Sequence, residues 1–162
     1  SIYQFQVQNR LRSPAHASEF VINVLADMYV RDVFKPEPPP VVPATMSYGE
    51  LKKVFSQSTR ECFPVRDEGG QLIGAINWDH TRPIVYEQGI EELVIAKDIM
   101  VPLETLSPDS SLYDALVKFL KTHQEELLVV SPEDQNSVLG VLRHDDLIHA
   151  YDREMRKRKI EL

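Results

Sequence analysis

Side chains that commonly carry catalysis or bind metals are few in this sequence and poorly spaced for either task. The histidines number five: His16, His80, His123, His144 and His149. None of them forms the HxxxH or HExxH pattern that places two imidazoles on one metal. The single cysteine, Cys62, excludes an internal disulfide and a cysteine-based zinc cluster. His144 and His149 have aspartates nearby, but no serine or cysteine lies in a recognisable nucleophile elbow. We therefore predict no catalytic residue and no metal site.

Motifs for phosphate transfer are missing too, because neither a Walker loop nor GxGxxG occurs. The 162 residues are 43% apolar and 27% charged, which excludes wholesale disorder. No apolar run approaches the roughly 20 residues that cross a bilayer, and no signal peptide is expected at the N-terminus. The net charge of −7 argues against nucleic acid as a partner. The basic residues near the C-terminus are interpreted as a solvated helix end, with a partner or a lipid headgroup as the alternative.

An internal repeat indicates the organisation of the chain. Four segments recur in the same order: residues 30–34 and 96–100 at an offset of 66, 48–51 and 113–116 at 65, 63–65 and 128–130 at 65, and 72–76 and 138–142 at 66. We interpret these as two copies of one unit of about 60 residues, since repeats of this size are single supersecondary units. Residues 1–29 then form an appendage to the pair.

Each copy shows the same order of local signals. Ser47 with Glu50, and Ser111 with Asp114, have the spacing of a helix-capping box. Apolar residues follow at helical spacing, and two strands come next, at 62–66 and 72–77 in copy one and at 127–131 and 138–143 in copy two. A final helix begins near Asp145, and its counterpart in copy one is shortened by Pro83. The sequence thus predicts an α/β (α+β) fold of two β-α-β-β-α units that pack face to face.

This tandem unit resembles a CBS domain pair. The resemblance rests on the closing motif of residues 140–147, on the opening motifs at 32–34 and 98–100, and on the order of elements. It covers residues 30 to about 156. The expected domains are a linker with a short helix at 1–29, repeat one at 30–90 and repeat two at 91–162.

A second resemblance concerns the N-terminal segment. Residues 1–4, Arg10, 13–14 and 24–33 look like the stretch that joins the last membrane helix of CLC-type chloride channels and transporters to their CBS pair. This likeness implies a non-catalytic regulatory domain at the cytoplasmic face of a membrane, attached to an ion-transport domain of the same polypeptide. Val21, Val24, Leu25 and Met28 predict a short amphipathic helix that docks on the pair.

The CBS resemblance also implies a nucleotide site. Family clefts often hold ATP, ADP or AMP, here as a regulatory ligand and not as a required cofactor. Asp146 occupies the position that accepts the ribose hydroxyls, and Arg143 stands where a serine or threonine usually helps with phosphate. The opposite wall is expected from Val41, Arg60, Glu61 and Cys62. Alternatively, Asp146 only caps the final helix.

The other family cleft is expected to be empty. It would use Asn77, His80, Leu103, Thr105 and the pair at 125–126, and its two carboxylates would repel phosphate. Three functions remain open: a nucleotide-sensing regulator, a purely structural dimerisation or trafficking module, and a regulatory domain of a soluble enzyme. A homodimer is expected through the apolar residues of the two helices of repeat two, namely Leu116, Phe119, Leu120, Leu147, Ile148 and Tyr151.

Overall fold

The computed structural model describes residues 14–81, 89 and 91–160. The elements in chain order are α2 (Pro14–Ala26), η2 (Val30–Asp32), β1 (Val42–Pro43), α3 (Tyr48–Ser56), β2 (Cys62–Arg66), β3 (Leu72–Asn77), α4 (Trp78–Thr81), α5 (Ala96–Ile99), β4 (Thr105–Leu106), α6 (Leu112–Thr122), β5 (Glu126–Val130), β6 (Val138–Arg143) and α7 (His144–Ile160). Residues 1–13, residues 82–88 with Pro83, residue 90 and residues 161–162 lie outside the described residues. Among the described residues, no helix is both long and apolar enough to cross a bilayer.

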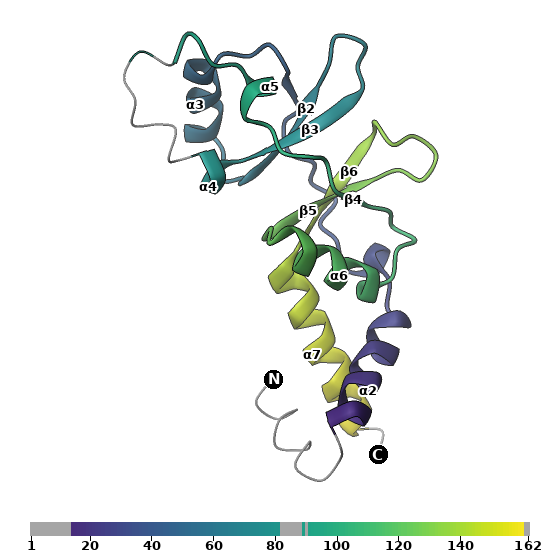
Figure 1. The fold of residues 1–162 in the computed structure, drawn as a ribbon. Coiled ribbons are helices and arrows are strands. Elements are labelled where there is room, and N and C mark those ends of the chain that lie inside the picture. Colours follow the sequence, from purple (N-terminus) through teal and green to yellow (C-terminus); the bar gives the residue numbers. More distant parts are fainter. Residues whose placement is uncertain (1–13, 82–88, 90, 161–162) are drawn as a thin grey trace.

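Two sheets of identical topology confirm the predicted repeat (Figure 1). Each has three strands, in the orders β1-β2-β3 and β4-β5-β6. The first strand of each sheet is parallel to the second, and the second is antiparallel to the third. The long helix after the first strand begins at a serine in both copies: Ser47 accepts from the backbone N–H of Glu50, and Ser111 from that of Asp114.

The strand register corrects the alignment of the two copies. Phe63 pairs with Ile76, and Leu127 pairs with Leu142, so Phe63 corresponds to Leu127, 64 residues later. The predicted match of Phe63 with Leu128 is therefore wrong by one residue, which reverses the face on which each β5 side chain lies. The N-cap serines Ser47 and Ser111 are also 64 residues apart. The later return to an offset of 66 reflects a longer hairpin turn in the second copy.

The opening segment of each copy crosses to the sheet of the other copy. Residues 29–35 of copy one lie against copy two: the N–H of Val30 donates to the carbonyl of Ser110, and Lys35 pairs with Val141. In the same way, the N–H of Ala96 donates to the carbonyl of Met46, and Val101 pairs with Ala75. This exchange ties the two repeats together through backbone hydrogen bonds, a feature that the sequence analysis did not predict.

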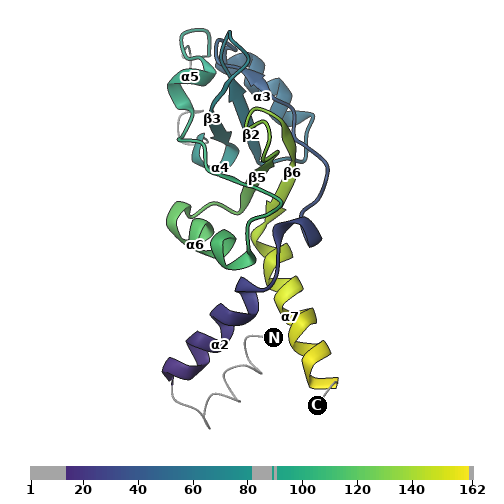
Figure 2. The same ribbon diagram turned by 90° about the vertical axis from the view of Figure 1, so that its right-hand side faces the viewer.

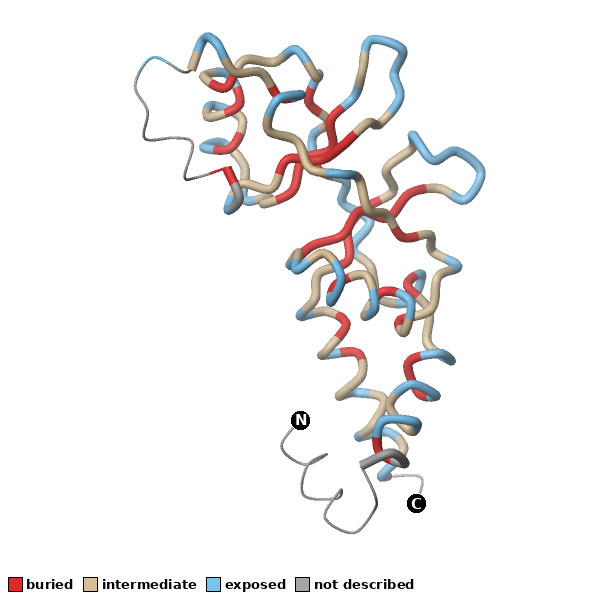
Figure 3. The backbone as a smooth tube through the Cα atoms, viewed as in Figure 1, coloured by how far each residue is buried: buried red, intermediate tan, exposed pale blue. Residues whose placement is uncertain are grey.

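Three apolar clusters hold the pair together. One lies between α6, α7 and the inner residues of β5 and β6, and it also contains Leu25 and Val30 from the N-terminal segment. A second lies between α3 and β2–β3, and it includes Ala96 from the second copy. The third joins the two sheets face to face through Cys62, Ala75, Leu128 and Val141, as expected. Figure 3 shows these buried stretches along the strands where the two halves meet.

The predicted docking helix is α2. Val24 and Leu25 are buried, and Val21, Leu25 and Met28 pack in the cluster that contains α6 and α7. Figure 2 shows α2 and α7 extending from the second sheet at the same end of the molecule. The described part of the closing helix of copy one is α4, with four residues, and the predicted effect of Pro83 lies outside the described residues.

Candidate functional site

Asp146 lies in the first turn of α7, immediately beyond the end of β6. Arg143 is the last residue of β6, and α7 begins at the next residue. Asp146 is thus inside the helix and does not occupy the N-cap position, although a carboxylate in a first turn still interacts favourably with the helix dipole. Its Oδ1 lies 3.9 Å from Nζ of Lys35. Its Oδ2 is buried and has no hydrogen-bond partner among the described residues.

Lys35 connects Asp146 to a second group of charged residues, which lies around Glu126. Glu126 opens β5 and pairs across the strands with Arg143. Arg143, Arg60, Glu61 and Lys35 all act electrostatically on Glu126. We call this set the Asp146 cluster: Lys35, Arg60, Glu61, Glu126, Arg143 and Asp146. It combines three basic and three acidic side chains, so the local charge is balanced even though the whole chain has a net charge of −7.

Glu126 is the most deeply buried charged residue of the cluster, with a residue exposure of 4%. Burial is the main cause that raises the pKa of its carboxyl group; Arg143 and Arg60 oppose this rise, Glu61 adds to it, and Lys35 opposes it. Its Oε1 is buried and has no hydrogen-bond partner within the described part of the chain. A buried oxygen of this kind carries a desolvation cost, and the attraction of Arg143, Arg60 and Lys35 offsets only part of it.

We expect Glu126→Gln to stabilise the fold at neutral pH. The folded state ionises Glu126 less readily than the unfolded state, so its contribution becomes less favourable as pH rises above the ordinary value of 4.5 and through the folded pKa. Urea unfolding at pH 7 should show the variant more stable by about 1–3 kcal/mol, with a smaller difference near pH 4. Glu125→Gln, at the exposed neighbour, is the control and should change little; a loss of stability at pH 7 in Glu126→Gln would contradict the account.

The predicted site residues are only partly brought together. Arg60, Glu61, Arg143 and Asp146 belong to the cluster, and Arg60 also lies 3.6 Å from Glu37. The Cys62 side chain is buried between the two sheets, where burial and the nearby Glu126 raise the pKa of its thiol to about 12. This thiol is therefore an unreactive packing group and not an exposed ligand contact.

Val41 precedes β1 and is half-buried. Val42 pairs with Val65 in parallel, so the register places Val41 level with Pro64, at the β1 edge of the first sheet and two residues along from Cys62. Its apolar side chain can line a site at this edge without adding a polar contact. Val41 and Cys62 thus add packing and no polar contact, and the polar chemistry belongs to the six members of the cluster.

The sequence analysis missed two members of the cluster, Lys35 and Glu126. It assigned Glu126 to the other site from the family resemblance, and an offset of 65 makes this residue the counterpart of Glu61. The observed offset of 64 pairs it with Cys62, whose side chain faces the second sheet. The capping serines Ser47 and Ser111 are also 64 residues apart, so the sequence already contained this offset. Lys35 reaches Asp146 because the opening segment crosses between repeats, and no local pattern predicts that crossing.

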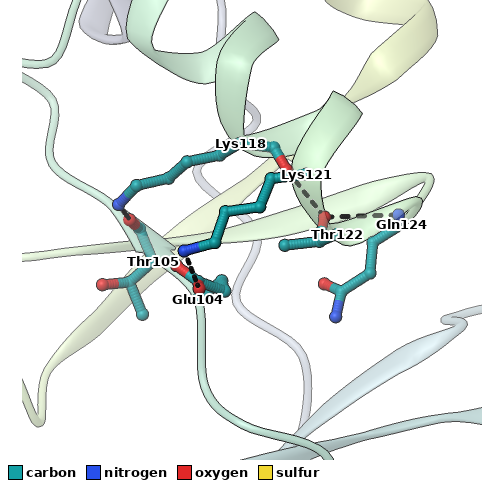
Figure 4. A network of polar contacts seen from close by, with 6 residues as sticks. All are labelled: Glu104, Thr105, Lys118, Lys121, Thr122 and Gln124. Atoms are coloured by element: carbon teal, nitrogen blue, oxygen red, sulfur yellow. Dashed lines mark hydrogen bonds and ion pairs between the residues drawn. The ribbon is translucent and has the colours of Figure 1, made fainter.

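The region of the other predicted site contains lysines that were not anticipated (Figure 4). Nζ of Lys118 donates to the backbone carbonyl of Thr105, and Nζ of Lys121 lies 3.3 Å from Glu104. Asn77 ends β3 at the equivalent of Arg143, while the His80 side chain lies outside the described residues. Repulsion by acidic residues alone therefore does not describe this region.

No group of three or more His, Cys, Asp or Glu side chains that could hold a metal ion occurs within the described residues. The chemistry available at the Asp146 cluster is thus that of hydrogen bonds and ion pairs. Carboxylate oxygens accept from hydroxyl or amine groups, and guanidinium and ammonium groups bind phosphate.

Comparison with known families accounts for this geometry. The model of the CBS domain matches residues 30–80 and again residues 96–153. The chain belongs to the CBS domain family. It is a tandem CBS pair, a regulatory module that is generally non-catalytic, and the two matched segments coincide with the two sheets and their helices.

Solved structures show the same fold at low sequence identity. The CBS domain of a bacterial CNNM/CorC family Mg²⁺ transporter is 13% identical with a TM-score of 0.65, and the match covers 90% of each chain. The same domain in complex with ATP is 15% identical with a TM-score of 0.64, over 80% of this chain and 90% of that one. The CBS domain of a membrane protein from Sphaerobacter thermophilus is 17% identical with a TM-score of 0.60, over 85% and 97%. No curated protein matches the chain.

Proposed function

We propose that this CBS pair binds an adenine nucleotide, ATP, ADP or AMP, at the Asp146 cluster and regulates a membrane transport domain of the same polypeptide. The observation that carries the proposal is the buried, unpartnered Oδ2 of Asp146, in a carboxylate whose Oδ1 lies 3.9 Å from Nζ of Lys35. Ribose hydroxyls supply the donors that this oxygen lacks, and Arg143, Arg60 and Lys35 supply the positive charge that phosphates require. The ATP complex of a CBS domain with the same fold adds support.

The transport domain in this proposal is a CLC-type chloride channel or transporter, with the CBS pair at the cytoplasmic face. Support for this choice comes from the sequence of residues 1–33, which resembles the corresponding CLC linker. Within that stretch, α2 is packed through Val24 and Leu25, so a movement of the pair displaces this helix and is not lost in a free tether. Similar folds occur in other membrane proteins, including the CNNM/CorC Mg²⁺ transporter.

The experiment that tests this function compares transport by the full-length protein with and without ATP, ADP or AMP. A regulatory ligand must favour one conformation of the transport domain over another. We expect the flux to change with nucleotide and this change to disappear in Asp146→Ala while basal flux persists. If the flux does not change with any of the three nucleotides although the CBS pair binds one of them, the proposed regulation is wrong and the proposed binding stands.

A structural dimerisation module is the second candidate function, favoured by exposed apolar residues on α6. The face first expected for the dimer needs correction, because Phe119 and Leu147 are buried within their own repeat. Leu120 is 64% exposed and Val117 is 45% exposed. We propose that these two side chains lie in the contact between two copies, since CBS pairs typically dimerise.

Leu120→Glu should weaken the dimer about tenfold or more, because it would bury a charge in an apolar contact. Sedimentation equilibrium measures the effect. The control is Leu93→Glu, at a position that is 81% exposed and far from α6 in the sequence. Equal association of the two variants would show that the α6 face is not the dimer contact.

A further inference from the structure

Glu126 offers an acceptor that the proposed ribose and phosphate contacts do not use. Its residue exposure is 4%, and its Oε1 has no hydrogen-bond partner among the described residues. Asp146 of the same cluster also has one buried oxygen without a partner. Two such carboxylates, both near Lys35, call for a ligand with hydrogen-bond donors in two separate places.

The different burial of the side chains in the cluster indicates where the phosphates and the base of a nucleotide would lie. The Lys35 side chain is 55% exposed, so its ammonium group extends toward solvent, whereas the Arg60 side chain is 22% exposed and lies further in. Phosphates keep water around them and are repelled by a carboxylate, so they belong at this outer side. Glu126 lies deeper, beside the buried Cys62 that packs between the sheets. The base is the uncharged part of a nucleotide, so it is the part that can bind at this buried position.

We propose that Glu126 is the residue of this site that recognises the base, and that it accepts a hydrogen bond from the exocyclic amine of adenine. This inference rests on the proposed nucleotide function and adds a specificity-determining contact to it. Glu126 acts here as an acceptor for a donor on the ligand, in addition to the ribose contact of Asp146. Binding then satisfies an oxygen that the folded chain leaves buried and unpaired.

The test uses titration calorimetry on the 162-residue chain. It compares ATP with purine riboside 5′-triphosphate, which lacks only the exocyclic amine of adenine. Wild-type protein should bind ATP about tenfold more tightly or better, since a hydrogen bond to a charged group is lost with the analogue. Glu126→Met, of similar volume and without an acceptor, should bind the two ligands with nearly equal affinity. Glu125→Met, at the exposed neighbour, is the matched control and should keep the wild-type preference.

The outcomes separate this inference from the function on which it rests. If Glu126→Met keeps the full preference for ATP, the base contact is wrong and the nucleotide site stands. Equal binding of ATP and the analogue by the wild type overturns the contact in the same way, even if the variant fails to fold. If the wild type binds neither ligand, nor ADP or AMP, the proposed nucleotide function itself fails and the base contact fails with it.

Discussion

Asp146→Ala is expected to weaken nucleotide binding by about 5- to 150-fold, the equivalent of about 1–3 kcal/mol. The substitution removes both acceptor oxygens, including the buried Oδ2 that no described residue satisfies. Little stability should be lost, because the pair with Lys35 spans 3.9 Å and the Lys35 side chain is half-exposed. Titration calorimetry with ATP, ADP and AMP measures the effect, and urea unfolding checks that the fold persists.

His80→Ala provides the matched comparison, because His80 follows Asn77 in copy one as Asp146 follows Arg143 in copy two. It should change nucleotide affinity by less than about twofold, since His80 is not a member of the Asp146 cluster. Asp146→Asn, which keeps one acceptor oxygen, should lie between the wild type and Asp146→Ala. Loss of binding in His80→Ala with intact binding in Asp146→Ala would show that the nucleotide binds at the His80 site, and the assignment to the Asp146 cluster would be wrong.

Gly140→Ala is expected to destabilise the fold by about 3 kcal/mol or more, because overpacking here involves backbone. A methyl group at Gly140 would lie 2.0 Å from the backbone oxygen of Lys35. The crossing segment would have to move, and the two hydrogen bonds between Lys35 and Val141, at 2.9 and 3.0 Å, would be broken or lengthened. Because Lys35 belongs to the Asp146 cluster, nucleotide binding should weaken as well.

Alanine substitutions at two other glycines, measured by urea unfolding, provide controls for the loss of stability in Gly140→Ala. A methyl at Gly74, the equivalent position in copy one, would meet the flexible Met100 side chain at 2.7 Å and the Val101 oxygen at 2.9 Å, so Gly74→Ala should cost less. Gly69, in the exposed β2–β3 turn, has no contact closer than 3.4 Å and should tolerate alanine. A Gly140→Ala variant as stable as Gly69→Ala would contradict the close crossing of the two repeats.

The elements that local rules predicted are those with a local cause. Ser47 and Ser111 mark helix starts because their side chains accept from the N–H group three residues later, and both bonds are present. The order β-α-β-β-α and the face-to-face sheets follow from apolar periodicity and from the need to cover exposed apolar surface. For the same reason, the helix around Val24 and Leu25 was predicted and is confirmed.

The features that escaped prediction depend on contacts between distant residues. The match of Phe63 with Leu128 rests on similar residue types in the sequence. The register of β5 is instead set by its pairing with β6, and a shift by one residue moves each side chain to the opposite face of the sheet. Glu126 was assigned to the other site, whereas the structure shows that Arg60, Glu61 and Lys35 act on it electrostatically. The position of Lys35 depends on the exchange of opening segments, which backbone hydrogen bonds to Val141 maintain. Residues far apart in the sequence thus complete the Asp146 cluster. The CBS resemblance had already named its other four members, Arg60, Glu61, Arg143 and Asp146.

The central claim is that one nucleotide binds per chain at the Asp146 cluster, and the stoichiometry of binding to the unmodified CBS pair tests it most directly. Titration calorimetry with ATP, ADP and AMP in separate experiments gives the number of sites and the affinity together. We predict one site per chain for at least one of the three nucleotides. Two sites per chain, or no heat of binding with any of them at millimolar concentration, would contradict it.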